Sequence, residues 1–278
     1  MRPPAPGSPP RAPRGAGAGA ALEVREQGTG PRVVLVHGSV LGAARTWRRQ
    51  QPLAARWRLV MPNRPGFGAS PPLQRGDFAA EAPLIAALLG GGAHLVGHSY
   101  GAVIALEAAA LAPRAVHSLT VSEPGCLRVA AGLPAADRQI AGGELLYAQA
   151  GRLQPREFLV AFRGGAGVTR ETPAALDGEL LAGVRLLMRE RPAWEADPPW
   201  EQLRLAPFPK LVLSGGHSEV FEAVCDRVAS LTGAERAQVP GRGHTIPAAG
   251  AYNETLEAFL TRAERARTGR SPRAGGAA

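Results

Sequence analysis

The sequence predicts an α/β fold: a doubly wound, mostly parallel sheet with a helical insertion. Short apolar runs alternate with longer segments of helical pattern over residues 22–125 and again over 210–267. Between them, residues 126–209 show no strand pattern. We therefore expect a core domain built from the two alternating segments, with residues 126–209 as a helical cap. Residues 1–21 and 268–278 are rich in Pro, Gly, Ala and Arg, which is typical of disordered tails.

Each expected element rests on a local pattern. Short, mostly apolar and often β-branched runs predict strands at 32–36, 58–61, 93–96, 116–121 and 210–213. Strands are also expected at 22–26 and 236–239. Trp47, Leu53 and Trp57 recur at helical spacing, and Asp77 is a suitable N-cap. Helices are therefore expected at 43–57, 78–89, 102–112, 218–231 and 252–267.

The formal net charge of +9 is concentrated at the two ends of the chain. Residues 1–21 carry three positive charges and residues 261–278 a net four, so about +2 remains for the rest. We expect no specific nucleic-acid partner for such a near-neutral body. No run reaches the roughly 18 apolar residues of a membrane span, and residues 1–21 lack the apolar centre of a secretory signal. The two cysteines, Cys126 and Cys225, predict neither a disulfide framework nor a metal site, and favour a cytoplasmic location.

The most informative stretch is Gly97-His98-Ser99-Tyr100-Gly101. It follows an apolar strand and precedes an Ala/Leu-rich helix, which is the strand–turn–helix arrangement of a Gly-x-Ser-x-Gly nucleophile elbow. Glycines two positions on either side of Ser99 have a physical reason, because a Cβ would clash where strand and helix approach so closely. We expect Ser99 in a strained conformation with its hydroxyl exposed for reaction.

Polar side chains follow the other predicted strands. His37-Gly38-Ser39 follows the strand at 32–36, Glu123 follows the strand at 116–121, and His244 comes after the strand at 236–239. Ligands of open parallel sheets bind beyond the carboxyl ends of the strands, so these groups are expected near Ser99. The chain order is then serine, acid, histidine.

These residues resemble the α/β-hydrolase fold family with a cap domain, over about residues 22–262. The resemblance rests on His37-Gly38, on Arg64-Pro65-Gly66-Phe67-Gly68-Ala69-Ser70, on the elbow and on Gly243-His244. It implies that Ser99 is the nucleophile and His244 the general base. It also implies an oxyanion hole formed by the backbone N–H groups of Tyr100 and Ser39.

The acid departs from the commonest pattern of that family. The usual position is a Gly-x-x-Asp after the strand at 210–213, and Ser218 stands there in this chain. The family also has an alternative position, after the strand that follows the elbow helix, and Glu123 occupies it. We take Glu123 as the acid; Ser218 or Glu219 in that role, or a site without an acid, are the alternatives.

The remaining histidines are expected to have other roles. His37 should hold the oxyanion loop and His98 should pack beside the nucleophile. His94, His117 and His217 are expected to be exposed or to have satisfied polar groups.

Together these features predict a cofactor-independent serine hydrolase that uses a Ser99–His244–Glu123 triad. Its expected substrate is a small, fairly apolar molecule with an ester, thioester or related acyl bond. A cofactor-free perhydrolase or a carbon–carbon bond hydrolase would use the same triad, and a non-catalytic small-molecule binding protein is the alternative of a different class. Haloalkane dehalogenase and epoxide hydrolase chemistry is not expected, because it needs an aspartate where Ser99 stands. The sequence predicts no oligomeric state.

Overall fold

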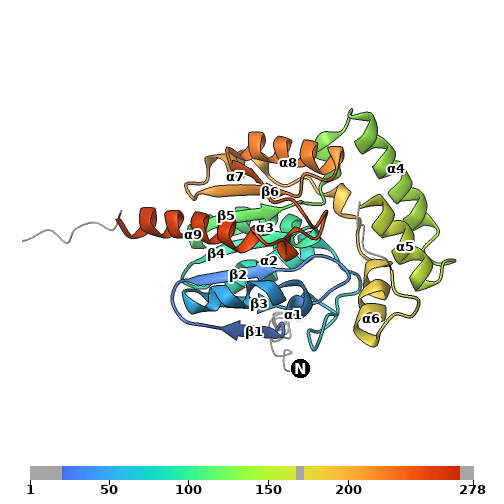
Figure 1. Ribbon diagram of the computed structural model, residues 1–278, viewed down its shortest axis with the longest axis horizontal. Coiled ribbons are helices and arrows are strands. Elements are labelled where there is room, and N and C mark those ends of the chain that lie inside the picture. Colours follow the sequence, from blue (N-terminus) through green and yellow to red (C-terminus); the bar gives the residue numbers. More distant parts are fainter. Residues whose placement is uncertain (1–20, 167–171, 270–278) are drawn as a thin grey trace, which may run out of the picture.

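The computed structural model describes residues 21–166 and 172–269, which contain a seven-stranded sheet (Figure 1). The strand order is β1-β3-β2-β4-β5-β6-β7. Strand β1 pairs antiparallel with β3, and the other neighbours pair in parallel. The strands are β1 (Val24–Gln27), β2 (Arg32–Val36), β3 (Arg58–Pro62), β4 (Ala93–His98), β5 (Val116–Ser122), β6 (Lys210–Ser214) and β7 (Glu235–Gln238). Each lies within two residues of its predicted bounds, and the mostly parallel sheet is confirmed.

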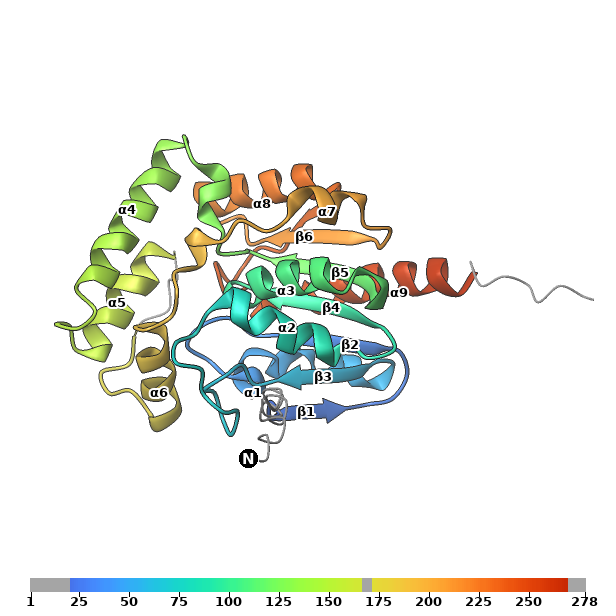
Figure 2. The same cartoon turned by 180° about the vertical axis from the view of Figure 1, so that it is seen from behind.

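Helices cover both faces of this sheet, as a doubly wound fold requires (Figures 1 and 2). Successive residues of β2 show why: Val33 and Leu35 pack with α1 and α9, whereas Val34 and Val36 pack with α2, α3 and α8. Because both faces are buried, β2 is continuously apolar from Val33 to Val36 rather than alternating. The flanking helices are α1 (Ala43–Thr46), α2 (Phe78–Leu88), α3 (Tyr100–Leu111), α7 (Trp200–Leu205), α8 (Glu219–Thr232) and α9 (Tyr252–Gly269).

Three further helices lie together at one end of the sheet (Figure 2). They are α4 (Pro134–Ala148), α5 (Pro155–Gly165) and α6 (Gly178–Leu187). Buried side chains of α5 and α6, among them Phe158, Leu180 and Val184, form a small apolar cluster with Val40, which lies in the loop after β2. These helices thus stand over the carboxyl ends of the strands. The described residues of 126–209 contain helices and no strand; the division into core and cap stays a prediction.

Two predicted helices differ from the structure. The expected helix at 43–57 is wrong: α1 ends at Thr46, and a 3₁₀ helix follows at Arg48–Ala55. Pro52 lies inside that segment, and a proline there lacks the N–H and clashes with the carbonyl that a continuous α-helix would need. Helix α9 runs to Gly269, so residues 268 and 269 are helical and do not belong to a tail. The other tail residues, 1–20 and 270–278, lie outside the described residues.

Among the residues that the structure describes, no helix is long and apolar enough to cross a membrane.

Candidate active site

Ser99 sits in the sharp turn between β4 and α3. Its backbone has φ 57° and ψ −119°, a region that side-chain-bearing residues rarely adopt. The flanking glycines permit this turn: a Cβ on Gly101 would lie 2.4 Å from the carbonyl oxygens of Val36 and His37, and one on Gly97 would lie 2.4 Å from the carbonyl oxygen of Gly101. The N–H of Ser99 donates to the carbonyl of Ser122 at the end of β5, which fixes the turn to the neighbouring strand.

The structure brings Ser99, His244 and Glu123 together in one line of hydrogen bonds. The Oγ of Ser99 lies 2.9 Å from Nε2 of His244. On the other side of the ring, Nδ1 of His244 lies 2.7 Å from Oε2 of Glu123. A carboxylate at this position accepts the Nδ1–H, which leaves Nε2 as an acceptor for the serine proton. Residues from the ends of β4 and β5 and from the loop after β7 therefore form one hydrogen-bonded unit.

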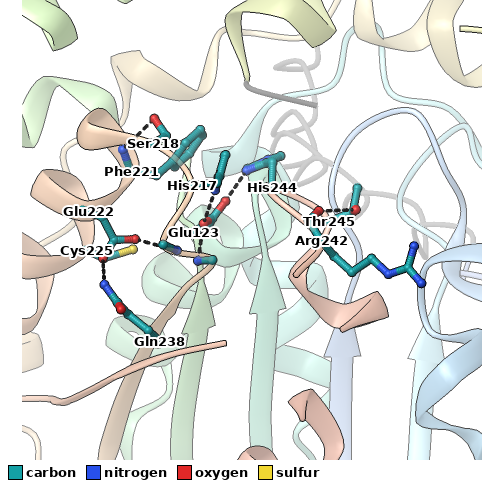
Figure 3. A network of polar contacts seen from close by, with 12 residues as sticks. Glu123, His217, Ser218, Phe221, Glu222, Cys225, Gln238, Arg242, His244 and Thr245 are labelled. Carbon is teal, nitrogen blue, oxygen red and sulfur yellow. Dashed lines mark hydrogen bonds and ion pairs between the residues drawn. The ribbon is translucent and has the colours of Figure 1, made fainter. Parts of the chain in front are cut away.

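Glu123 is fully buried directly after β5 and carries more contacts than the one with His244. The N–H of Gly215 donates to its Oε1 at 2.6 Å, and Nδ1 of His217 lies 3.3 Å from the same oxygen. Figure 3 shows the Glu123 carboxylate between His217 and His244. Its backbone φ of 46° is in the left-handed region, and its N–H is held by the carbonyl of Leu213 at 2.9 Å. Glu123 thus has an unfavourable backbone conformation, and in this conformation its side chain points towards His244.

Burial dominates the electrostatics of this pair. It raises the pKa of Glu123 to about 7, while the nearby His217 and the Gly215 N–H act in the opposite direction. Burial also lowers the pKa of His244, and His217 lowers it further. His244 is therefore neutral at pH 7, in the form that can accept a proton.

The two alternative acids lie elsewhere. Ser218 is the N-cap of α8, and its Oγ accepts a hydrogen bond from the Phe221 N–H at 3.4 Å. Glu219 begins that helix and is exposed. Neither has a hydrogen bond or ion pair with His244 among the described residues. Of the three candidates, the geometry places Glu123 beside the imidazole.

Ser39 and Tyr100, the predicted oxyanion pair, both line the cavity next to Ser99. Neither backbone N–H has an acceptor within the described part of the chain, so both are available to a substrate oxygen. The Ser39 hydroxyl donates to Oε2 of Glu190 at 2.5 Å. Glu190 in turn accepts from the buried guanidinium of Arg64, whose Cζ lies 4.2 Å above the ring of Tyr100. One buried charge network thus contacts both oxyanion candidates.

The other histidines show which roles the sequence could predict. His37 lies where expected, with Nδ1 donating to Gly38 O at 2.8 Å and Nε2 accepting from the Arg64 N–H at 2.9 Å. His98 packs beside the nucleophile, 2.8 Å from the carbonyl of His244. The expectation for the remaining three histidines is wrong, because His94, His117 and His217 each have a buried ring nitrogen without a hydrogen-bond partner among the described residues. The side chain of His217 is 14% exposed, and its Nδ1 makes a long contact of 3.3 Å with Glu123. No spacing or motif signals this contact, which depends on how the loop after β6 folds.

Two cavities meet at Ser99 and His244. The larger has a volume of about 440 Å³ and is mostly apolar. The second, of about 250 Å³, lies on the side of the loop after β2 and is bordered by several arginines. The lining of the larger cavity includes Leu127, Leu146, Tyr147, Phe162, Trp194 and Phe221.

One group within residues 21–166 and 172–269 could hold a metal ion: His94, His117 and Glu264, whose ligand atoms lie within 4.8 Å of one another. His94 and His117 are near the starts of β4 and β5, at the opposite end of the strands from Ser99. Arg267 donates to both oxygens of Glu264. This cluster is therefore separate from the candidate active site.

The sequence matches a family model and several known proteins. The model of the alpha/beta hydrolase family matches residues 33–259. A relative from Pseudomonas putida, named the dihydrolipoyllysine-residue acetyltransferase component of the acetoin cleaving system, is 34% identical over 245 residues, which are 83% of this chain and 64% of that protein. The chain thus spans less than two thirds of that relative.

A pimeloyl-[acyl-carrier protein] methyl ester esterase from Methylococcus capsulatus is 36% identical over 194 residues, which cover 62% of this chain and 76% of the relative. Among solved structures, an alpha/beta hydrolase from Sphaerobacter thermophilus superposes with a TM-score of 0.63 at 22% identity, covering 86% of this chain and 96% of that one. At this identity the structural likeness supports the fold alone.

Proposed function

The chain belongs to the α/β hydrolase family and is an enzyme of that family, and we propose that it is a cofactor-independent serine hydrolase. In this proposal it cleaves an ester, thioester or related acyl bond of a small, fairly apolar molecule. Ser99 is the nucleophile, His244 the general base and Glu123 the acid. The backbone N–H groups of Ser39 and Tyr100 form the oxyanion hole.

The observation that carries the proposal is the unbroken line of contacts from the Ser99 hydroxyl through His244 to Glu123, at the wall of an apolar cavity. A serine hydroxyl is a weak nucleophile until a base takes its proton. Nε2 of neutral His244 is within hydrogen-bond distance to do so. The apolar cavity supplies a place for the hydrocarbon part of an acyl compound.

Catalysis starts when the Ser99 Oγ attacks the substrate carbonyl carbon and its proton moves to Nε2 of His244. The carbonyl π electrons move to the oxygen, where the N–H groups of Ser39 and Tyr100 stabilise the negative charge. Losing one such donor typically costs about 10²–10³ in rate. Glu123 stabilises the imidazolium through the Nδ1 hydrogen bond without taking its proton.

The intermediate collapses when His244 passes the proton to the leaving oxygen or sulfur, and the bond to that atom breaks. The acyl group is then attached to Ser99. Water attacks this acyl-enzyme, again with His244 as base, and the acid product and free Ser99 are released. Two of the relatives, one named a methyl ester esterase and the other an acetyltransferase component, have names that describe acyl chemistry, which supports the proposal.

Replacement of Ser99 tests this proposal. Ser99→Ala should lower the turnover of 4-nitrophenyl esters by at least about 10³-fold and leave the melting temperature nearly unchanged. Ser218→Ala is the matched control, because it removes a nearby hydroxyl that does not contact His244. Near-wild-type hydrolysis by Ser99→Ala would reject the proposal. An absence of hydrolysis by the wild-type protein on a broad ester and thioester panel would favour a non-catalytic binding protein.

A further inference from the structure

The cavity on the side of the loop after β2 has an unusual lining. It reaches Ser39, Ser99 and His244, as the apolar cavity does, but its lining residues also include Arg45, Arg48, Arg49 and Arg163. The described residues that line it include no Asp or Glu. A cleft of one sign concentrates the electrostatic field and attracts an opposite charge. The second cavity therefore presents positive charge directly beside the proposed nucleophile.

The positive charges of Arg48 and Arg49 are not neutralised by a described carboxylate. Both are exposed at the start of the 3₁₀ helix that follows α1. Neither side chain has a hydrogen bond or an ion pair among the described residues. Arg45 differs, because Asp177 at 3.0 Å and Glu179 at 3.7 Å neutralise it. Within residues 21–166 and 172–269, no carboxylate competes with an anion for Arg48 and Arg49.

These two arginines line both the second cavity and a shallow groove whose described lining does not include Ser99, so they connect the two. Gln51, Pro52 and Asn253 line the groove with them, and its volume is about 540 Å³. A substrate that reaches from Ser99 along this path would place its far end, not its reacting bond, against the two guanidinium groups. Guanidinium groups bind phosphate and carboxylate through paired N–H donors, which makes them suited to such an end group.

The two cavities at Ser99 thus differ in chemistry. The larger one is lined mostly by aliphatic and aromatic side chains, and Arg138 is the one charged residue in its described lining. The described lining of the smaller one includes four arginines. Resting on the serine-hydrolase function above, we propose that the substrate is a two-ended acyl compound: its apolar half occupies the larger cavity, and its other half carries a phosphate or carboxylate that Arg48 and Arg49 bind.

Matched substrate pairs that differ by one anionic group test the proposal. S-hexanoylpantetheine and its 4′-phosphate differ on the leaving-group side. 4-Nitrophenyl hexanoate and 4-nitrophenyl hydrogen adipate differ at the end of the acyl chain. We expect the wild-type enzyme to prefer the anionic member of one pair by about 10-fold or more in kcat/KM, mainly through KM. The pair that shows the preference identifies which half of the substrate carries the anion.

The double variant Arg48→Gln/Arg49→Gln should lose this preference and hydrolyse the neutral substrates within about twofold of wild type. Both side chains are exposed, so the melting temperature should stay nearly constant. Arg138→Gln, which removes a charge beside the other cavity, is the matched control and should keep the preference.

Equal use of both members of each pair by the wild type would overturn the inference, as would a preference that survives in the double variant or disappears in Arg138→Gln. These results are distinguishable from failure of the hydrolase assignment, because Ser99-dependent hydrolysis of the neutral esters would persist in each of them.

Discussion

Three polar contacts of the site converge on the Glu123 carboxylate. Its two oxygens meet the imidazole of His244, the N–H of Gly215 and the ring of His217. In the proposed reaction its charge stabilises the imidazolium that forms when Ser99 attacks. An amide of the same shape would keep much of the packing and lose that charge.

Glu123→Gln should therefore lower kcat by about 10²–10⁴-fold on the best ester substrate, by analogy with loss of the acid in other Ser–His–acid enzymes. The kcat values should be measured near pH 8, where His244 is neutral in every variant. Ser218→Ala and Glu219→Gln should stay within about tenfold of wild type. A normal rate in Glu123→Gln with a collapse in one of those two variants would assign the acid to the loop after β6.

The buried carboxyl also predicts a pH dependence. The pKa of Glu123 is raised to about 7, so the group takes up a proton as the pH falls below that value. A protonated Glu123 donates to Nδ1 of His244, which places the ring proton on Nε2 and removes the base. We expect kcat/KM to rise between pH 5 and 8 with a midpoint near 7. In His217→Asn the midpoint should move to higher pH, because His217 lowers the pKa of Glu123. A pH-independent rate over this range would contradict this account.

Ser99 and Glu123 could be predicted from the sequence as candidates, because each follows a mostly apolar strand and parallel strands end at the same edge. His244 follows the more polar strand β7 and could be predicted from the family resemblance of Gly243-His244. The contact between His217 and Glu123 could not be predicted from the sequence. Gly216, with φ 66°, turns the chain after β6 so that the next side chain points back towards Glu123. Such a turn has no pattern beyond the glycine itself.

The strand–turn–helix element that presents Ser99 depends on two glycines. Gly101 lies against the backbone of the loop after β2, where a Cβ would be 2.4 Å from two carbonyl oxygens. Backbone atoms cannot rotate away as a side chain can, so helix α3 or the loop that carries Ser39 would have to move.

Gly101→Ala should accordingly destabilise the protein by about 1–3 kcal/mol or more and impair ester hydrolysis, because the turn and the oxyanion loop shift together. Urea unfolding and initial rates would measure both effects. Gly91→Ala is a suitable control, since the space around its Cβ position is empty to 4 Å. Wild-type stability and activity in Gly101→Ala would show that the close approach is not required.

At the scale of elements, apolar runs predicted the strands well because a strand buried on both faces has a simple signature. The prediction of one α-helix over residues 43–57 is wrong for a local reason. The spacing of Trp47, Leu53 and Trp57 is compatible with an α-helix, but Pro52 between them is not. All three side chains are nevertheless buried: Trp47 lies between α1 and the 3₁₀ helix, Leu53 within the 3₁₀ helix, and Trp57 after it.

Across the whole molecule, Arg64 joins three distant segments. Its buried guanidinium contacts Glu81 of α2 at 2.7 Å and Glu190, beyond α6, at 2.7 Å. Glu190 also accepts from Ser39, so α2, the oxyanion loop and the helices over the sheet meet at one charge network. Removing its cation would leave two buried carboxylates without a counter-charge.

Arg64→Met should cost about 3–5 kcal/mol in the free energy of unfolding, as expected when one partner of a buried ion pair is lost. Arg58→Gln, which removes an exposed ion pair with Glu26, should cost at most about 1 kcal/mol. Chemical denaturation of the two variants gives the comparison. Similar stability losses in both would mean that the buried network contributes no more than a surface pair.

This network could not be predicted from sequence, because Arg64 and Glu190 are 126 positions apart and their pairing depends on how α6 packs over the strand ends. The resemblance to a known family covers the Arg64-Pro65-Gly66 segment but does not indicate what Arg64 contacts.

Covalent labelling is the most direct way to identify the nucleophile. After reaction with a fluorophosphonate, mass spectrometry of the intact protein and of its peptides should find one adduct per chain, on Ser99. Labelling should be absent in Ser99→Ala and slower in Glu123→Gln. An adduct on another residue, or no adduct while Ser99-independent ester hydrolysis continues, would contradict the account.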